Sequence, residues 1–463
     1  MKRSVPIAAI AMLALSGCVA GPDYAPPVRE ATGAQFLRGD GQDAAVPAAQ
    51  WWKDLGDAWL DDLIERAMSD SPAVAVAEAR VRKARAGIAA TRASLLPSVS
   101  ASALYVYADL PSGAFGTGGG QELFNLGFDA QWEADLWGGK RRDVERSVAQ
   151  AGAAQAALAD ARVMLSAEIV RAYVTLRARQ SSLELLEQRK AEEVRLADLA
   201  RDRRAGGTAT VQEVLAARQR IDRTSSEIAT LTADRDATLD ALAVLAGQEP
   251  GSLAPVPEGR IPLPPAQAKI GDPAAMLARR PDVMAAERKL AAATAGIGIA
   301  EARRFPSVSL MGIIGIGGTS IDDVFDTSQA ASLVLPRLSW SFLDFGRNAA
   351  ALDAAEADRD AALAEYRSSV LIALRDAEAA LTRFGAARIA LAHTRVASER
   401  QDEITRLQGL RAKAGTISQV EATEARIGEI DARLAYRNAS ANVTLAYVTL
   451  AKALGLGWQS SGD

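Results

Sequence analysis

The sequence predicts a mainly α-helical chain with a small β portion, built from one structural unit that occurs twice. Three observations lead to this prediction. Two long windows without proline carry apolar residues at helical spacing, short segments alternate polar and apolar residues, and the same order of motifs returns about 208 residues later. The expected fold is therefore a duplicated unit of long coiled-coil αα-hairpins, with four amphipathic strands in the whole chain.

The duplication is clearest in residues that begin or end helices. Pro72 and Pro97 are 25 residues apart, and Pro281 and Pro306 repeat that spacing. Two further motifs recur in the same order, Gly207-Thr208 as Gly415-Thr416 and Leu245-Ala246-Gly247 as Ala453-Leu454-Gly455. A register that drifts by only one residue over this distance indicates a duplicated unit. We assign residues 57–270 to the first repeat and 271–463 to the second.

The composition excludes several classes of function. The formal net charge of the 463 residues is −4, which leaves no basic footprint for nucleic acid. One His and one Cys are present, and the sequence shows no metal-ligand cluster, no phosphate loop before a helix and no nucleophile with a His partner. We therefore expect neither enzymatic activity nor a cofactor.

The N-terminus predicts export and lipid attachment. Lys2 and Arg3 precede an apolar run that is too short to span a bilayer. The tetrapeptide Leu15-Ser16-Gly17-Cys18 follows, and it resembles a bacterial lipobox. We expect residues 1–17 to be a signal peptide and Cys18, the sole cysteine, to carry the lipid. Residues 18–56, which are rich in Pro, Gly and Ala, are expected to form an extended, weakly structured and lipidated arm.

Each repeat is expected to contain a very long helical hairpin, because both proline-free windows keep the apolar spacing of coiled coils. The expected helices span about 139–205 and 209–246 in the first repeat, and about 346–413 and 417–454 in the second. The first helix of each pair is about 100 Å long at 1.5 Å per residue. Gly207 and Gly415 are expected to end these helices, and Thr208 and Thr416 to cap the returning ones.

Ahead of each hairpin the period changes from 3.6 to two. Phe124, Leu126 and Phe128, for example, alternate with polar or small residues. The expected strands span about 97–108, 123–136, 306–316 and 332–343. Strands of this length, with one apolar face and aromatic residues near their ends, suit a membrane barrel. Four strands cannot close a barrel and open edges cannot face lipid, so several chains would have to share one; a soluble sandwich is the alternative.

Several short stretches carry a family resemblance that covers essentially the whole mature chain. They are Cys18 followed by Gly21-Pro22-Asp23-Tyr24, Ala172-Tyr173-Val174-Thr175-Leu176-Arg177, Arg280-Pro281-Asp282-Val283, Phe305-Pro306-Ser307, and the strand-to-helix junctions Trp132-Glu133-Ala134-Asp135-Leu136-Trp137-Gly138 and Trp340-Ser341-Phe342-Leu343-Asp344-Phe345-Gly346-Arg347. In combination they resemble the outer-membrane efflux factors, the TolC-like duct proteins. The resemblance is strongest to their lipoprotein branch, the NodT-type or OprM-like group.

The resemblance implies a homotrimer with a twelve-stranded β-barrel in the outer membrane, continued by a periplasmic α-barrel. It implies passive conduction of solutes that a periplasmic membrane-fusion adaptor and an inner-membrane pump deliver. The implied partners are two further copies of the chain, the adaptor, the pump and outer-membrane lipid. The implied location is the outer membrane of a Gram-negative bacterium, with a lipid anchor and an extension into the periplasm.

The resemblance also assigns roles to residues at the hairpin tips. The residues that match the adaptor-contacting turns are Gly206, Gly207, Thr208, Gly415 and Thr416. Val420 matches an apolar constriction, and Glu421 and Glu424 match an acidic ring at the periplasmic gate. Threefold symmetry would bring three copies of each carboxylate together and favour cations. Helix capping at the tips and an ordinary solvated helix face at the two glutamates are the alternatives.

Two other protein classes share part of this pattern. A lipid-anchored periplasmic adaptor also has a lipobox and an αα-hairpin, but adaptors lack the twofold duplication and the four strands. A coiled-coil scaffold protein would explain the helices, and dependence on detergent would separate it from a barrel protein. The sequence leaves open the exported substrate, the class of the pump and whether the aperture rests open or closed.

Overall fold

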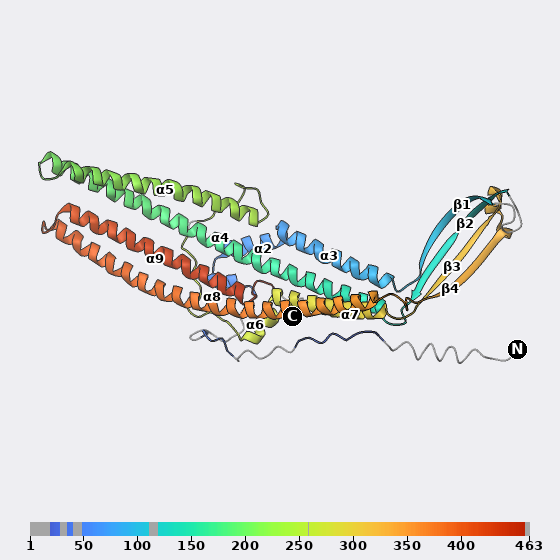
Figure 1. Ribbon diagram of the computed structural model, residues 1–463. Helices are drawn as coiled ribbons and strands as arrows, with labels where there is room; N and C mark the ends of the chain where they lie inside the picture. Colours follow the sequence, from blue (N-terminus) through green and yellow to red (C-terminus); the bar gives the residue numbers. More distant parts are fainter. Residues whose placement is uncertain (1–18, 28–34, 40–48, 111–118, 258, 459–463) are drawn as a thin grey trace. The chain divides into compact units, whose positions relative to one another are not determined.

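The computed structural model describes residues 19–27, 35–39, 49–110, 119–257 and 259–458, so Cys18 and the expected signal peptide lie outside the described residues. The described part is mainly helical and contains one small sheet (Figure 1). The chain divides into two compact units, each of which combines segments of both sequence repeats. The first unit holds residues 1–28, 80–155 and 285–368, and the second holds 29–79, 156–284 and 369–463.

The first unit contains a four-stranded antiparallel sheet whose strands pair in chain order. The strands are β1 (Ser98–Leu110), β2 (Gly119–Ala134), β3 (Ser307–Gly318) and β4 (Ala330–Ser339). In the first hairpin Ser98 lies opposite Gln131, and in the second Ser307 lies opposite Ser339. These two pairs occupy equivalent positions in the repeats, so the duplication extends to the register of the strands.

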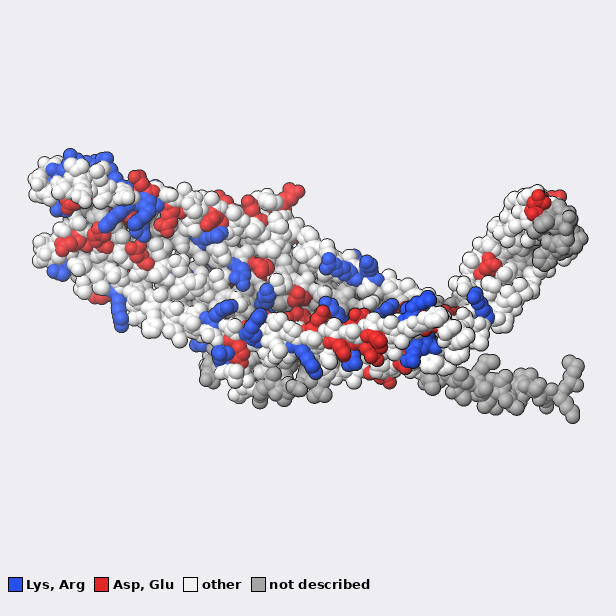
Figure 2. Space-filling view, viewed as in Figure 1, with Lys and Arg blue, Asp and Glu red and all other residues white. Residues whose placement is uncertain are grey.

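The register gathers apolar side chains on one face of the sheet, because successive residues of a strand point to opposite faces. Leu126 lies opposite Ala103 on one side and Ile316 on the other, and Phe128 lies opposite Ile314. Most large apolar residues of this face are exposed, among them Val99, Leu126, Phe128, Ile314, Val334 and Leu338. Few charged side chains are seen over the strands in Figure 2. The chain by itself thus leaves an apolar sheet face uncovered.

The helices of the first unit adjoin the ends of these strands. α3 (Pro72–Ala93) precedes β1, and α7 (Pro281–Ala302) precedes β3, and the first residues of both helices belong to the second unit. The two 67-residue helices α4 (Gly139–Ala205) and α8 (Arg347–Lys413) follow β2 and β4, and both continue into the second unit. Each repeat therefore reads helix, strand, strand, long helix in the same order.

The second unit consists of the remaining helical segments around an apolar core. It contains η1 (Trp51–Leu55), α2 (Ala58–Asp70), α5 (Val211–Leu245), α6 (Pro273–Arg279) and α9 (Gln419–Ala453). The coiled-coil positions Leu165, Ile169, Leu176, Leu183 and Leu186 of α4 are buried. Aromatic rings complete the core, with Trp51 edge-on to Tyr447 and Phe384 beside it. None of the helices in the described ranges combines the length and the hydropathy that a bilayer crossing requires.

Some element boundaries differ from the expected ones for a physical reason. β4 ends at Ser339, four residues before the expected end, because the chain turns there to cap α8. The Asp344 carboxylate accepts hydrogen bonds from the backbone N–H groups of Gly346 and Asn348, at 3.0 and 2.8 Å. Asp135 does the same for α4, accepting from Lys140 and Arg141. Both carboxylates satisfy amide groups at a helix N-terminus and complement its dipole.

Candidate functional site

The two hairpin tips have the same backbone structure. Gly207 and Gly415 both have φ of 73°, the left-handed conformation that glycine adopts at little cost. The amide of the next residue closes the turn on the outgoing helix, from Thr208 to the Arg203 carbonyl at 2.7 Å and from Thr416 to the Arg411 carbonyl at 3.0 Å. A side-chain Cβ at either glycine would meet nothing within 4 Å, so both turns are open to an incoming surface.

The structure corrects the expected role of the two threonines. The Thr208 and Thr416 hydroxyl groups donate to the carbonyls of Arg203 and Arg411, at 2.9 and 3.0 Å. They therefore end the outgoing helices and do not cap the returning ones. The capping residues are Thr210 for α5 and Ser418 for α9, two residues farther along. The Thr210 and Ser418 hydroxyl oxygens accept from the amides of Glu213 and Glu421, which is the hydrogen bond that caps each returning helix.

Each returning helix begins with a complete capping box. Glu213 accepts from the Thr210 amide, and Glu421 accepts from the Ser418 amide at 2.8 Å and the Ser418 hydroxyl at 2.9 Å. The backbone hydrogen bond from Ser418, aided by the hydroxyl, lowers the pKa of Glu421. Glu213 occupies the equivalent position in the first repeat, and its pKa is lowered by the same bonds from Thr210. Helix capping thus accounts for one carboxylate in each repeat.

The three expected gate residues lie together in the first turns of α9. Val420 is half-buried, whereas Glu421 and Glu424 are exposed. Glu424 pairs with Arg220 of α5 at 2.8 Å, and this ion pair connects the two hairpins. Sequence reasoning did not find Arg220, because the two residues are 204 positions apart and no local pattern links them.

Both strand-to-helix junctions are held by tryptophan indoles. Trp132 donates to the Leu95 carbonyl at 2.9 Å, and Trp340 donates to the Arg304 carbonyl at 3.0 Å, which are equivalent bonds in the two repeats. Trp137 also donates to the Pro306 carbonyl at 2.7 Å, and its ring stacks on Phe305 with centroids 4.7 Å apart. These contacts bind the end of one hairpin to the start of the next.

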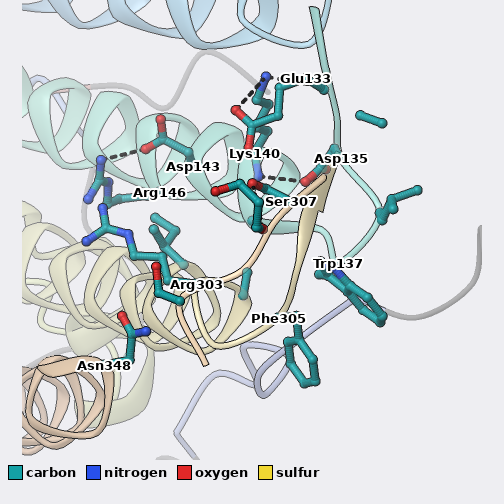
Figure 3. A pocket seen from close by; sticks show the side chains of 17 residues that line it. Glu133, Asp135, Trp137, Lys140, Asp143, Arg146, Arg303, Phe305, Ser307 and Asn348 are labelled. Carbon is teal, nitrogen blue, oxygen red and sulfur yellow. Dashed lines mark hydrogen bonds and ion pairs between the residues drawn. The ribbon is translucent and has the colours of Figure 1, made fainter. Parts of the chain in front are cut away.

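A pocket of about 560 Å³ opens beside the first junction (Figure 3). Its labelled residues come from both repeats and are mostly charged or polar. Lys140 pairs with Glu133 at 3.6 Å, and Arg146 pairs with Asp143 at 2.5 Å. These two ion pairs make the lining of the pocket polar and occupy four of its charged groups.

The segment that follows Cys18, at the start of the predicted extended arm, makes several contacts with the rest of the first unit. The buried Arg142 side chain donates to the carbonyls of Ala20 and Gly21, at 3.1 and 3.0 Å, and to the Asp23 carboxylate at 2.8 Å. The Ala20 amide donates to the Trp137 carbonyl at 2.8 Å. These hydrogen bonds hold residues 19–24 in place without forming a helix or strand.

Glycines in the neighbouring elements permit this close approach. A Cβ on Gly138 would lie 2.7 Å from the Val19 side chain, and a Cβ on Gly298 would lie 2.7 Å from the Ala20 carbonyl oxygen. Tyr24 also donates a hydrogen bond to the Glu287 carboxylate. Gly138 and Gly298 were the available sequence signal, because glycine permits close approach of another backbone. One sequence does not show which segment approaches them.

Two motifs of the second unit serve to hold it together. Arg280 donates to both Asp282 oxygens, at 2.9 and 2.6 Å, and to the carbonyl of Ala453 at the end of α9, at 2.9 Å. Burial acts to raise the pKa of Asp282, but hydrogen bonding and the charge of Arg280 outweigh it and lower the pKa. Tyr173 donates to Asp57, the N-cap of α2, and accepts from Arg177 at 2.9 Å. Within the described ranges, no cluster of His, Cys, Asp or Glu is suited to hold a metal ion.

The comparisons with known proteins agree in one family. A family model described as "Outer membrane efflux protein" matches residues 63–248 and 273–456, which is most of the chain and follows its duplication. Outer membrane protein OprJ of Pseudomonas aeruginosa is 28% identical over 455 residues, covering 96% of this chain and 94% of that protein. Nodulation protein T of Rhizobium leguminosarum bv. viciae is 30% identical over 467 residues, covering 96% and 90% respectively.

Solved structures show the same fold. The structure described as the outer-membrane channel OprN superposes with a TM-score of 0.88 at 32% identity, covering 96% of this chain and all of that one. A second structure, the outer membrane channel CmeC of Campylobacter jejuni, superposes with a TM-score of 0.84 at 20% identity and covers 96% of each chain. At that lower identity the likeness concerns the fold alone.

Proposed function

The chain belongs to the outer membrane efflux protein family and is an outer-membrane channel component of an efflux system, and from this premise we propose that it works as a homotrimer. In this proposal three four-stranded sheets close one twelve-stranded barrel, and the long helices continue it as a duct through the periplasm. The duct conducts solutes passively, without a chemical step in this chain. A periplasmic adaptor and an inner-membrane pump load it at the hairpin tips.

The observation that carries this proposal is the uncovered face of the sheet. Its apolar residues, such as Phe128 and Ile314, are more than half exposed, at 57% and 58%. The outer edges of β1 and β4 have no partner strand within the described ranges. Lipid is the solvent that favours such a face, and lipid excludes unpaired strand edges, so a sheet of this kind requires further strands from other copies.

The fixed N-terminal segment supports the proposed lipid anchor on Cys18. Val19 and Ala20 lie at the strand-to-helix junction, held by Gly138, Trp137 and Arg142. A lipid on the preceding residue would therefore start close to the end of the strands, where a membrane surface is expected. The acyl chains would enter the same leaflet that this end of the barrel meets.

The tips are the proposed contact with the adaptor, through Gly206, Gly207, Thr208, Gly415 and Thr416. The two turns have the same structure, and their glycines are exposed, with open space at Gly207 and Gly415 and only ordinary contact at Gly206. Gly206 lacks a positive φ, so bulk can be added there without straining the turn. Gly206→Trp, with Ala414→Trp as its counterpart in the second repeat, should keep the trimer and weaken capture of the adaptor. A variant trimer that binds the adaptor as well as the original does would remove this assignment.

Val420, Glu421 and Glu424 are proposed to line the periplasmic aperture. Their position in the first turns of α9, next to the tip, supports this assignment. The Arg220–Glu424 ion pair connects the hairpins there, so releasing it offers a way to widen the aperture. Glu421 also caps its own helix, which makes Glu424 the better choice for a test of the gate.

Planar-bilayer recording tests the channel and the gate together. The purified protein should migrate as a heat-modifiable trimer in detergent and should conduct ions, with a preference for cations. Glu424→Ala should change both the conductance and the cation preference, whereas Glu213→Ala, which removes the first-repeat counterpart of Glu421, should leave the preference intact. A protein that stays monomeric and soluble without detergent would overturn the channel.

A further inference from the structure

The two strand-to-helix junctions are equivalent in sequence but not in their surroundings. In the first repeat, Trp137 stacks on Phe305 and bonds to the Pro306 carbonyl, so the end of β2 is fixed to the segment that leads into β3. The counterpart of Trp137 in the second repeat is Phe345, and this ring is 88% exposed. One of two equivalent aromatic side chains is therefore left without its contact.

The backbone of Phe345 makes this exposure notable. Phe345 is the one non-glycine residue with positive φ in the described part of the chain, at 53°. A bulky residue adopts this left-handed conformation at a cost, and such strain persists where the surrounding structure or a binding contact requires it. The next residue, Gly346, has φ of 87° and could make the turn alone. The aromatic ring is therefore the feature that needs an explanation.

The missing contact has an identifiable partner elsewhere in the same sequence. Phe305-Pro306, which Trp137 contacts, is the second-repeat counterpart of Leu96-Pro97 before β1. Leu96 is 68% exposed. β1 and β4 form the two edges of the sheet, so Leu96, just before β1, and Phe345, just after β4, lie beside opposite unpaired edges. A second copy beside β4 can place its own Leu96 against Phe345. This contact would be equivalent to the one between Phe305 and Trp137 within the chain.

We propose that the contact between β2 and β3 within the chain is the template for the contact between β4 of one copy and β1 of the next. This inference rests on the proposed trimer and adds its register. Leu338 of β4 corresponds to Ala130 of β2, and Ala103 of β1 corresponds to Gly312 of β3. Because Ala130 lies opposite Gly312 within the chain, the same register places Leu338 opposite Ala103 of the next copy. Phe345 then seats against Leu96 of that copy.

The chemistry of the two faces supports this register independently. Leu338 lies on the apolar face with Val308, its partner in β3. Ala103 lies on the same face, since it pairs with Leu126. A slip of one residue would place Leu338 opposite Ser102 of the polar face and would invert every pair along the seam. The transferred register is thus the one that keeps the apolar face continuous from copy to copy.

Cysteine cross-linking tests the register directly, since residues directly opposite in an antiparallel pair bring their Cβ atoms within about 5.5 Å. Under oxidation, Ala103→Cys with Leu338→Cys should link neighbouring copies into dimers and trimers on a non-reducing gel. The matched control, Ser102→Cys with Leu338→Cys, should link them at least tenfold more slowly. Ala130→Cys with Gly312→Cys should link within one chain and calibrates the rate. The single-cysteine variants account for any reaction of Cys18.

The outcomes separate this inference from the proposed function. Trimers that conduct but link only through the Ser102 pair would overturn the register and leave the channel standing. Absence of any trimer would overturn both. Phe345→Gly gives a second test, because it relieves the backbone strain and removes the ring. If the ring makes the proposed contact, the trimer should dissociate at a lower temperature despite the relieved strain. Phe345→Leu should restore most of the loss. A trimer made more heat-resistant by Phe345→Gly would refute the contact.

Discussion

Arg142 and Asp23 form an ion pair at 2.8 Å in which the arginine side chain is 3% exposed and the aspartate side chain is 94% exposed. The pair joins α4 to the segment that follows the proposed lipid anchor. Because only the arginine is buried, the two partners contribute unequally. The guanidinium group also binds the carbonyls of Ala20 and Gly21, whereas Asp23 remains in contact with water.

Removing each partner should therefore have a different effect. Arg142→Ala leaves two carbonyls without their charged donor and should cost about 2 kcal/mol of stability, whereas Asp23→Asn should cost about 0.2–1 kcal/mol. Limited proteolysis should show faster cleavage of residues 19–27 in Arg142→Ala than in Asp23→Asn. Equal cleavage rates in the two variants would show that the carbonyl bonds do not hold the segment.

The capping box of α9 should make the tip sensitive to acid. The pKa of Glu421 is lowered from its ordinary value of 4.5, chiefly by the Ser418 amide. The stabilising bond is therefore fully present above about pH 4.5 and is lost as the pH falls through the lowered pKa. The hydrogen-exchange rate in the first turn of α9, divided by that of Glu421→Gln at the same pH, should lie below one at neutral pH and rise toward one in acid. A ratio that does not depend on pH would contradict this assignment.

The tips also show how far the sequence predicts local structure. Gly207 and Gly415 were expected at the ends of the long helices, and the structure has them there in left-handed conformation. The cap two residues later was misassigned, because Thr208 and Thr210 are both good N-cap residues and the choice depends on which hydroxyl oxygen meets the free amides of the returning helix. Local propensity predicts the turn, whereas the path of the chain through the turn decides which residue becomes the N-cap.

Long-range partners were beyond the reach of sequence patterns. Nothing near Arg220 indicates Glu424, and nothing near Ala20 indicates Arg142, because these contacts depend on how distant segments pack. The apolar and polar faces of the strands were predictable, since a period of two is a local property. The faces of the strands can therefore be predicted from the local alternation of residues, whereas the long-range ion pairs can be found only once the fold is known.

Arg280 should be sensitive to a conservative substitution. Its planar guanidinium binds both oxygens of Asp282 and the Ala453 carbonyl at once, and a lysine ammonium cannot match that geometry. Arg280→Lys should destabilise the protein by about 1.5–3 kcal/mol. The dissociation temperature of the trimer in detergent measures the effect. As a control, Arg395→Lys changes an arginine whose side chain is 63% exposed and should leave that temperature nearly unchanged.

The Arg220–Glu424 pair should affect conduction more than stability. Both side chains are 43% exposed, and an ion pair of this kind contributes about 0–1 kcal/mol and is screened by salt. Arg220→Gln should therefore leave the unfolding temperature almost unchanged and raise the single-channel conductance. In the unmodified protein, conductance should rise with salt more steeply than the bulk conductivity does. If Arg220→Gln conducts as well as the original protein, this ion pair is not part of the gate.

The tryptophans at the two junctions offer a test of the duplication itself. Trp132 and Trp340 donate equivalent indole hydrogen bonds, at 2.9 and 3.0 Å, to the carbonyls of Leu95 and Arg304. Phenylalanine keeps an apolar ring but removes the donor, so Trp132→Phe and Trp340→Phe should each cost about 1 kcal/mol. The two losses should be similar and additive in the double variant, since the two bonds share no partner. Denaturant unfolding of the four proteins measures this, and a double variant no less stable than either single one would show that the junctions act as a coupled pair.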